Sequence, residues 1–463
     1  MINLEKNKLS GWSCASSTIC SIFVAKNKVD LRKIISYSKK NDLTICTKGS
    51  GNSYGDEFQN ENNIVVDTST MNKILSWHPE SGIMIVEPGV SLQKTLKVTL
   101  PDNWVLPVVP GTRFPTIGGC VSNNVHGKNS YKVGNFGDYV REFDIILFSG
   151  EIVNCSREKN SELFYSAIGG MGMLGIFTRI SLQLKKVEST NLCVKKCTVP
   201  NLGGMIEFIT NSTANCDYVI GQIDCFQKGN KIGRGTIHTA VHAPNNLLKN
   251  SYTDDLEIPE RFFSVVPANW ALKLGKIFIS SFSMRLISNL KYYVDFFNSK
   301  KNGHFQSFPK FNFLLDRIPD WPKVFKHGFY EFEPLIPAEK ANKVIEEILI
   351  ISQQSKMIPY ICGIKLHRKD DFLLSYSLNG FSVGFDYPRI PQKIEKQKEI
   401  FFKLHEIVAD SGGIVYLAKD NLVTPEHFKK MYNIRIDEFL RIKKQYDPNM
   451  LFQSNMFRRL FLN

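Results

Sequence analysis

The chain has 463 residues, 43% of them hydrophobic and 12% aromatic, a composition typical of a globular protein with at least two domains. Its 58 basic and 44 acidic residues give a net charge of +14, which favours anionic partners. The N-terminus lacks the apolar core of a secretory signal, and no run of about 18 uncharged apolar residues occurs. We therefore expect a cytoplasmic protein, either free or peripheral at a membrane.

The ten cysteines are scattered, without a C-x-x-C pair or the spacing of a zinc site. Cys193 and Cys197 are four residues apart, but no second pair accompanies them. The pattern predicts free thiols in a reducing compartment and no metal site.

Short strands and helices alternate through the first 185 residues, which predicts an α+β domain. The expected elements are a helix over 28–41, strands over 44–49, 63–69 and 82–91, a helix over about 91–99, a hairpin over 144–156 that turns at Ser149-Gly150, and a glycine loop leading into a strand over 169–184.

After residue 190 the pattern changes. Strand-like alternation fills 195–240 and 355–388, and the tail 425–463 is helical and then basic. Between the strand-rich parts lies a basic-aromatic segment, 261–301, with seven basic residues against one acid, Asp295.

The basic-aromatic segment has an apolar row at helical spacing, formed by Leu274, Phe278, Phe282, Leu286 and Leu290. One interpretation is a helix packed in the core with a solvated basic face. The other is a surface that lies on anionic lipid. Nucleic acid is a weaker third alternative, because no DNA- or RNA-binding motif accompanies the charge.

Three glycine-rich loops follow one another along the chain. KGSGNSYGD (48–56) departs from both the Walker and the Rossmann templates. PGTRFPTIGGCVSNNVHGKN (110–129) follows about sixty residues later, and GGMGMLGI (169–176) has the small residues that a flat ring needs for close approach. Two such loops can hold a pyrophosphate from both sides through backbone donors.

With these loops the chain resembles the FAD-binding oxidoreductases of the vanillyl-alcohol oxidase type, which share the PCMH-type FAD domain. Within them it is most similar to the decaprenylphosphoryl-ribose 2'-oxidase family. The similarity begins at LSGW (9–12) and includes the three loops and GNFGDYVREFDIILFSGEI (134–152). It also includes GFSVGFDYP (380–388), GGIVYLAKD (412–420) and the tail 437–460.

The resemblance implies an α+β fold with a two-subdomain PCMH-type FAD-binding domain over 1–190. A substrate or cap domain, built on an antiparallel sheet, is expected over 191–410 with 261–301 as an insertion. Residues 411–463 are expected to return to the FAD domain.

The resemblance also implies FAD held without a covalent bond. Asn52 stands where some relatives have a histidine that tethers FAD, and an amide cannot form that bond. His126 follows the second loop and is not expected to carry the link. The expected cofactor-binding residues are Thr47, Lys48, Gly49, Ser50, Gly51, Asn52, Ser53, Tyr54, Gly55, Asp56, Glu57, Gly111, Thr116, Ile117, Gly118, Gly119, Asn123, Asn124, Val125, His126, Ile176 and Tyr416.

Oxidation of an alcohol by a flavin needs a group that accepts the hydroxyl proton and positive charge near the flavin. Lys419 is the candidate for binding the substrate oxygen, and it would need desolvation or a cationic neighbour to act as a neutral base. Tyr54 and Lys128 are expected at the sugar or its phosphate, and Lys365 on the cap side of the pocket. The identity of the base stays open at this point.

Two positions depart from the family pattern. Gly384 stands where the family has a cysteine facing the flavin, and Glu333 replaces a family glutamine. A carboxylate at Glu333 would repel an anionic lipid phosphate.

The resemblance implies oxidation of a secondary hydroxyl on a sugar, with a polyprenyl-phosphate-linked pentose as the expected substrate. In that pathway a short-chain reductase then reduces the ketone, so that the sugar is epimerised. A soluble sugar-alcohol or aldonolactone oxidase is the alternative enzyme. A non-catalytic protein that binds a membrane or nucleic acid is the third hypothesis, and it predicts a colourless protein.

Overall fold

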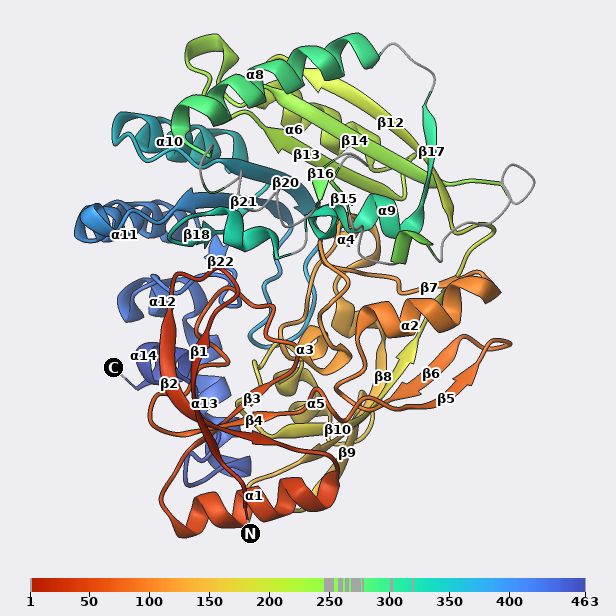
Figure 1. The fold of residues 1–463 in the computed structure, drawn as a ribbon, viewed down its shortest axis with the longest axis vertical. Helices are drawn as coiled ribbons and strands as arrows, with labels where there is room; N and C mark the ends of the chain where they lie inside the picture. The colour runs from red at the N-terminus through yellow and green to blue at the C-terminus, as the bar shows by residue number, and fades with distance from the viewer. Residues whose placement is uncertain are drawn as a thin grey trace.

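The computed structural model describes residues 2–244, 254–256, 261–262, 266–267, 276, 279–299, 303–318 and 320–462. Two sheets from the N-terminal part of the chain lie below a large sheet from its central part (Figure 1). The fold is α+β, as the sequence predicts, with helices packed on mainly antiparallel sheets.

The first sheet has four strands in the order β1-β2-β4-β3, with β2 and β3 both parallel to β4. Helix α1 (Lys28–Lys40) connects β2 to β3, as the sequence predicts, and Asn27 caps it by accepting from two backbone N–H groups. The strands are β1 (Glu5–Ser10), β2 (Ser17–Val24), β3 (Ile45–Lys48) and β4 (Ile64–Asp67).

The second sheet is antiparallel, in the order β5-β6-β10-β8-β9. It contains the predicted hairpin, in which Gly150 has a φ of +87° that suits a tight turn. Its strands are β5 (Ile74–His78), β6 (Ile83–Val86), β8 (Val140–Ile146), β9 (Ile152–Ser156) and β10 (Ile176–Gln183). Around it lie α2 (Leu92–Thr99), α3 (Ile117–Ser122), α4 (Ser130–Val133), α5 (Ser161–Ala167) and the short pair β7 (Trp104–Val105) and β11 (Lys185–Lys186).

The central part of the chain forms a nine-stranded sheet, which we call the cap sheet. Its path is β17-β12-β14-β13-β20-β21-β19-β22, and β18 pairs with β21. The strands are β12 (Asn191–Val199), β13 (Tyr218–Ile223), β14 (Gly235–His242), β17 (His304–Ser307), β18 (Phe329–Phe332), β19 (Pro334–Pro337), β20 (Ile361–His367), β21 (Gly380–Pro388) and β22 (Ile414–Val415).

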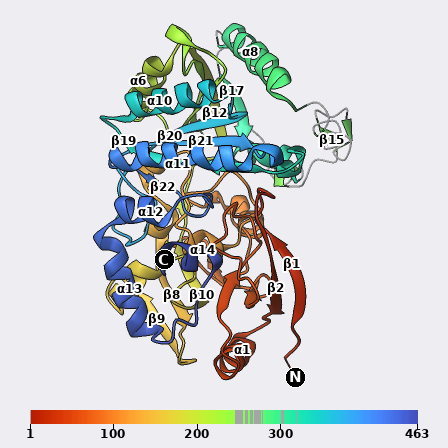
Figure 2. The same cartoon turned by 90° about the vertical axis from the view of Figure 1, so that its left-hand side faces the viewer.

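Helices cover both faces of the cap sheet. Side chains alternate along a strand, so the neighbours of Gly235 and Thr236 on β14 identify the two faces. A Cβ at Gly235 would meet Met205 of α6, whereas Thr236 donates to Asp295 of α8. The helices are α6 (Leu202–Ser212), α8 (Ser281–Asn298), α9 (Phe308–Asn312), α10 (Ala341–Gln354) and α11 (Ile394–Asp410). Figure 2 shows α6 and α10 on the side of the sheet away from α8. The strand-like pattern over 195–240 did not predict α6.

Helix α8 carries its apolar row on the outside. Phe282 is 74% exposed and Leu290 67% exposed, while the buried residue of the helix is Asp295. The core-packed interpretation is therefore wrong for this part of the row. Leu274 and Phe278, the first two members, lie outside the described residues.

The chain ends beside its beginning. Phe452 forms a parallel bridge with Ile45 of β3, and Asn455 donates its backbone N–H to Gln59. The C-terminal helices are α12 (Pro425–Tyr432), α13 (Ile434–Tyr446) and α14 (Asn455–Phe461).

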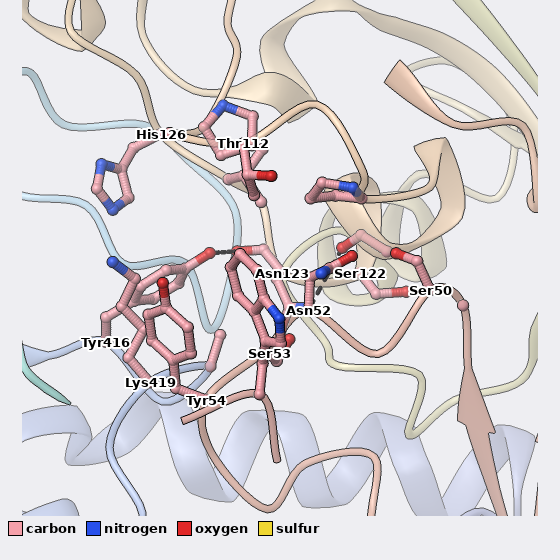
Figure 3. A pocket seen from close by; sticks show the side chains of 18 of the residues that line it. Ser50, Asn52, Ser53, Tyr54, Thr112, Ser122, Asn123, His126, Tyr416 and Lys419 are labelled. Carbon is pink, nitrogen blue, oxygen red and sulfur yellow. Dashed lines mark hydrogen bonds between the residues drawn. The ribbon is translucent and has the colours of Figure 1, made fainter. Parts of the chain in front are cut away.

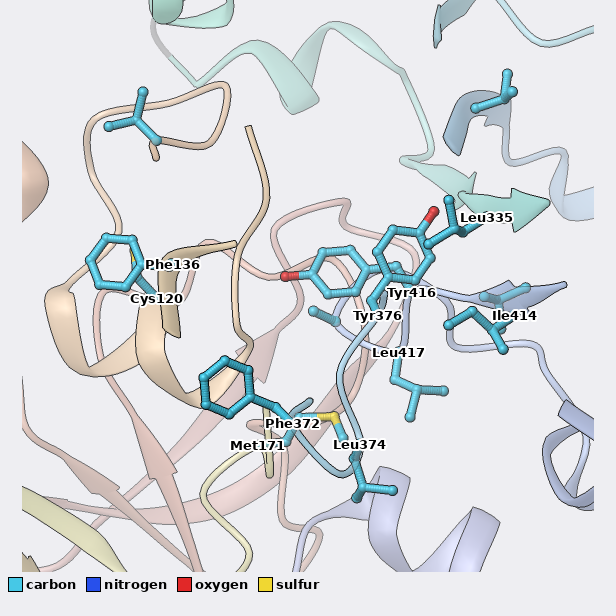
Figure 4. Packing of buried hydrophobic residues seen from close by; sticks show 14 of the residues in the cluster. Cys120, Phe136, Met171, Leu335, Phe372, Leu374, Tyr376, Ile414, Tyr416 and Leu417 are labelled. Carbon is cyan, nitrogen blue, oxygen red and sulfur yellow. The ribbon is translucent and has the colours of Figure 1, made fainter. Parts of the chain in front are cut away.

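Aromatic packing connects the cap to the loops below it (Figure 4). Tyr376 stacks on Tyr416 with ring centroids 4.7 Å apart, and Phe136 and Leu335 belong to the same buried cluster. All ten cysteines are free thiols. Among the described residues, no helix is long and apolar enough to cross a membrane.

Candidate active site

A cavity of about 310 Å³ lies between the cap sheet and the glycine loops. Its volume falls within the usual range of cofactor and substrate sites. All three glycine loops line it from below, and inward-facing residues of β13, β20 and β21 line it from above. The loop residues Asn52, Ser53 and Tyr54 lie together with Asn123, His126 and Lys419 around this space (Figure 3).

The first two glycine loops touch each other. A Cβ at Gly49 would lie 2.2 Å from Thr116 Oγ1, so only glycine allows this approach. Thr116 caps α3 by accepting from the backbone N–H of Gly119. Strand β3 ends at Lys48, whose Nζ lies 2.6 Å from Asp67 Oδ2 and so fixes the start of the first loop.

The cavity has the polar groups and the close approaches that FAD requires. Buried oxygens in its lining that have no hydrogen-bond partner within the described residues include Asn52 Oδ1 and Asn123 Oδ1. Gly172 of the third loop has a φ of +73°, and a Cβ there would lie 2.4 Å from Thr47 Oγ1. The loops thus leave room and unpaired polar atoms for a ligand with many hydrogen-bonding groups.

Most residues predicted to bind the cofactor line this cavity. Those in the lining are Thr47, Lys48, Gly49, Ser50, Gly51, Asn52, Ser53, Tyr54, Glu57, Gly111, Thr116, Gly118, Gly119, Asn123, Val125, His126, Ile176 and Tyr416.

Four of the predicted residues lie outside the lining. Asp56 pairs with Arg459 at 2.7 Å, and Gly55 donates its backbone N–H to Ala418, so both connect the loop to the C-terminal part of the chain. Asn124 donates to Asp370 and Ser375, and Ile117 is fully buried in the core. Each supports the loops from behind.

His126 is buried, with its Nε2 3.4 Å from Glu333 Oε1. Burial, with Lys365 adding to it, lowers the pKa of His126 to about 4. The ring is therefore neutral near pH 7 and stands against Tyr416, with ring centroids 5.2 Å apart. Tyr416 in turn donates to the backbone oxygen of Asn123.

At the cap side of the cavity, five charged residues form a carboxylate–lysine cluster. Lys419 Nζ lies 2.6 Å from Glu331 Oε1 and 2.7 Å from Glu333 Oε2. Lys365 Nζ lies 3.5 Å from Glu333 Oε1 and equally far from His126 Nδ1. The fifth member, Asp386 on β21, is directly opposite Glu331 of β18 in the strand register.

Charge neighbours set the protonation of the cluster. Burial alone would lower the pKa of Lys419, but Glu331 and Glu333 outweigh it and hold that pKa well above 10.5. Burial would raise the pKa of Glu333, yet Lys419 and Lys365 hold it well below 4.5. Burial, followed by the charge of Glu331, raises the pKa of Asp386 well above 3.8. The cluster thus pairs a lysine that holds its proton strongly with one carboxyl, Glu333, that favours its ionised form and another, Asp386, that favours its protonated form.

The absence of a side chain at Gly384 makes room for the carboxylates of Glu331 and Glu333. A Cβ at this position would lie 3.1 Å from Glu331 Oε1 and 3.7 Å from Glu333 Cδ. Both departures from the family pattern named above, Gly384 and Glu333, therefore meet at one place.

Aromatic rings close the site around Tyr54. Trp12 stacks on its ring at 5.4 Å, Trp321 and Phe329 meet its edge, and Lys419 Nζ lies 5.5 Å from the ring centroid. Burial raises the pKa of Tyr54 well above 10, so its hydroxyl stays protonated and can donate.

Lys128 also lines the cavity. Its Nζ donates to the backbone oxygens of Phe311 and, at 3.1 Å, Asn312. These contacts hold the ammonium at the cavity wall, in a position to meet an anionic group.

Sequence reasoning missed Glu331, Asp386 and Trp321. A signal for two of them exists, because Glu331 shares a strand face with Glu333, and Asp386 shares one with Gly384, two residues away. Trp321 begins a 3₁₀ turn in a part of the chain without periodic pattern, and nothing local singles it out.

Comparison with known proteins agrees with this geometry. The FAD binding domain family matches residues 21–156, and the D-arabinono-1,4-lactone oxidase family matches residues 323–460. The chain is 29% identical to the decaprenylphosphoryl-β-D-ribose oxidase of Mycolicibacterium smegmatis, over 98% of this chain and 97% of that protein. The protein is a PCMH-type FAD-dependent oxidoreductase.

Other relatives of this oxidoreductase align over shorter stretches. It is 24% identical to a putative D-arabinono-1,4-lactone oxidase of Neurospora crassa, over 37% of this chain and 31% of that protein. It is 28% identical to cytokinin dehydrogenase 9 of Oryza sativa subsp. japonica, over 35% of this chain and 32% of that protein. The latter match covers about a third of each chain.

Bound FAD supplies the two-electron acceptor for oxidation of a CH–OH group. The three glycine loops would hold it, and the cap sheet covers the space beside it. The carboxylate–lysine cluster offers an ammonium for a substrate oxygen and carboxylates for its proton. The arrangement is therefore suited to oxidising an alcohol in a site sheltered from water.

Proposed function

We propose that this oxidoreductase oxidises a secondary hydroxyl of a sugar carried on a polyprenyl phosphate, with a pentose oxidised to its 2'-keto product. The observation that carries the proposal is the similarity to decaprenylphosphoryl-β-D-ribose oxidase over nearly the whole of both chains. The ketone would be reduced by a separate short-chain reductase, completing an epimerisation. FAD is held non-covalently, since Asn52 cannot form a bond to it.

Helix α8 supports a substrate whose lipid tail stays in a membrane. Its buried Asp295 accepts from Thr236 of β14 and pairs with Lys196 of β12 at 3.6 Å, so the polar side of the helix holds it on the cap sheet. Its exposed apolar side faces outward, with Arg285 exposed beside it. An apolar face with basic residues suits the surface of anionic lipid.

A soluble sugar-alcohol or aldonolactone oxidase is the second candidate. The carboxylate–lysine cluster favours it, because Glu331 and Glu333 already neutralise Lys419 and Lys365. A phosphate close to those carboxylates would be repelled, whereas a neutral polyol would not. The lipid-linked substrate therefore requires its phosphate at the Lys128 side of the cavity.

Anaerobic bleaching of the bound flavin tests these alternatives. The purified protein is expected to be yellow and to release FAD into the supernatant on acid precipitation. A short-chain polyprenylphosphoryl-β-D-ribose is expected to bleach the flavin faster than arabinitol or D-arabinono-1,4-lactone at equal concentration. If arabinitol or D-arabinono-1,4-lactone bleaches the flavin and the lipid-linked ribose does not, the protein is a soluble sugar-alcohol or aldonolactone oxidase.

A further inference from the structure

We propose that Glu331 accepts the hydroxyl proton of the substrate, while Lys419, held as an ammonium between Glu331 and Glu333, binds the substrate oxygen. This inference rests on the proposed oxidation of an alcohol and names the base within that same site. It does not depend on which sugar is the substrate.

Lys419 does not have the surroundings of a neutral base. A lysine base needs a cationic neighbour or an apolar pocket that removes its proton. Lys419 instead has one carboxylate oxygen at 2.6 Å and another at 2.7 Å. One N–H group of Lys419 donates to Glu331, Glu333 Oε2 lies 2.7 Å away as an ion-pair partner, and the ammonium has further N–H groups that can meet a substrate oxygen.

The two glutamates have different surroundings. Glu333 has three nitrogen neighbours, since side-chain nitrogens of Lys419, Lys365 and His126 all lie within 3.5 Å of its oxygens. A carboxylate held in this way is a weak base. Glu331 contacts one cation, Lys419, and lies opposite a second carboxyl, Asp386, on the paired strand.

The charges facing Glu331 come from every side of the cavity. Burial and the charge of Glu333 disfavour its ionised form, whereas Lys419 and Lys365 favour it. Burial is the largest of these effects and raises the pKa of Glu331 above its ordinary value. The pKa values of Glu331 and Glu333 are thus moved in opposite directions. In such a pair the carboxyl with the higher pKa exchanges the proton, and the other stays ionised.

Gly384 leaves room for the Glu331 carboxylate at the cavity wall. The nearest atom to a Cβ at that position would be Glu331 Oε1, so the space that a side chain would occupy belongs to this carboxylate. Glu331 also lines the cavity, together with Tyr54 and Trp321, and can reach a sugar bound there.

The step balances with the groups of the site. The substrate O–H bond breaks and its proton goes to the Glu331 carboxylate. The carbinol C–H bond breaks, and its hydride is passed to the flavin. The carbon–oxygen bond becomes a carbonyl, so the alcohol loses two electrons and FAD gains two. The Lys419 ammonium stabilises the negative charge that develops on the oxygen.

Chemical rescue tests the proton transfer in the FAD-loaded enzyme. Glu331→Ala is expected to slow anaerobic flavin reduction by about a hundredfold or more, the scale of a positioned base. Added formate or acetate should restore part of the rate, the more basic anion restoring more. Glu333→Ala, the matched control, should show no such rescue. A rate for Glu331→Ala within tenfold of the wild type, or rescue confined to Glu333→Ala, would overturn the assignment.

A second measurement needs no substrate. Because the folded protein holds a proton on Glu331 more tightly than the unfolded chain does, Glu331 makes the folded state less stable as pH rises above about 4.5. The thermal midpoint of Glu331→Gln should therefore fall less, or rise more, between pH 5 and pH 8 than that of the wild type. Parallel midpoint curves would contradict the proposal. If no alcohol bleaches the wild-type flavin, the proposed function fails on that result, while the midpoints still test Glu331.

Discussion

Gly384 and the two glutamates facing it show how one missing side chain alters the chemistry of a pocket. A thiol at this position would lie against Glu331, at the cap side of the cavity. The cysteine nearest in sequence, Cys362, is buried, and burial raises its pKa well above 9. It is therefore a poor nucleophile.

We expect Gly384→Cys to make the enzyme sensitive to electrophiles that add to a pocket thiol. The new Cβ would require Glu331 Oε1, 3.1 Å away, to shift by a few tenths of an ångström, so FAD binding should survive. Mass spectrometry after turnover with such a compound should show an adduct at position 384. The wild type is the control, and an adduct on it within residues 355–388 would show that Cys362 is accessible.

His126 should make stability depend on pH. Its pKa of about 4 in the folded protein lies below the ordinary 6.5, so the unfolded chain binds the proton more readily. The free energy of unfolding should therefore fall as pH drops from 6.5 towards 4, by up to roughly 3 kcal/mol from this residue. His126→Asn should flatten the fall in urea titrations at pH 7 and pH 4.5. His78→Asn, at an exposed position, is the control and should leave the change in free energy of unfolding between these two pH values as it is in the wild type.

At the scale of the element, α8 combines a polar buried side with an apolar exposed one. A triple variant with serine in place of Phe282, Leu286 and Leu290 should bind anionic vesicles at least tenfold more weakly in a sedimentation assay. These side chains are 74%, 55% and 67% exposed, so they are available to enter the lipid. Arg285→Gln should weaken binding less and reduce its dependence on salt. Ile350→Ser on α10 is the matched control, with unchanged binding expected. If the wild-type protein stays in the supernatant with vesicles of every composition, α8 has no membrane role.

Sequence periodicity predicted an element correctly where local signals along the chain agree. Helix α1 has a side-chain cap and an apolar stripe, and it formed as predicted. The row in α8 has the same spacing, yet it is exposed, because the opposite side of the helix, with Asp295 and Asn289, makes the contacts to the sheet. Periodicity identifies a face but not what covers it. The same limit applies to the site: the glycine loops were predictable from local residues, whereas the cluster of Glu331 with Lys419 joins residues 88 positions apart.

For the molecule as a whole, a buried ion pair fastens the C-terminal segment. Lys443 Nζ lies 2.8 Å from Asp447 Oδ2 and donates to the backbone oxygens of Met173 and Phe452, with both charged side chains fully buried. The pair therefore joins α13, the third glycine loop and the Phe452 bridge that precedes α14.

Breaking this pair should destabilise the whole protein. Lys443→Met leaves Asp447 buried without its cation, a change that typically costs about 3–5 kcal/mol in the free energy of unfolding. Urea denaturation should show this loss together with a weaker affinity for FAD, since Met171 and Gly175 of the adjoining loop line the cavity. Exposed Lys444→Met is the neighbouring control. Equal midpoints for the two variants would contradict this account.

The bridge between Ile45 and Phe452 also bears on how the protein is made. Strand β3 leads directly into the first glycine loop, yet its outer edge receives a partner from the opposite end of the chain. Because Phe452 is translated long after Ile45, the nascent N-terminal sheet has an open edge while the cap is translated. The strand that carries the first glycine loop is thus completed only after the cap has been made, and a chain cut before Phe452 would leave that strand without its partner.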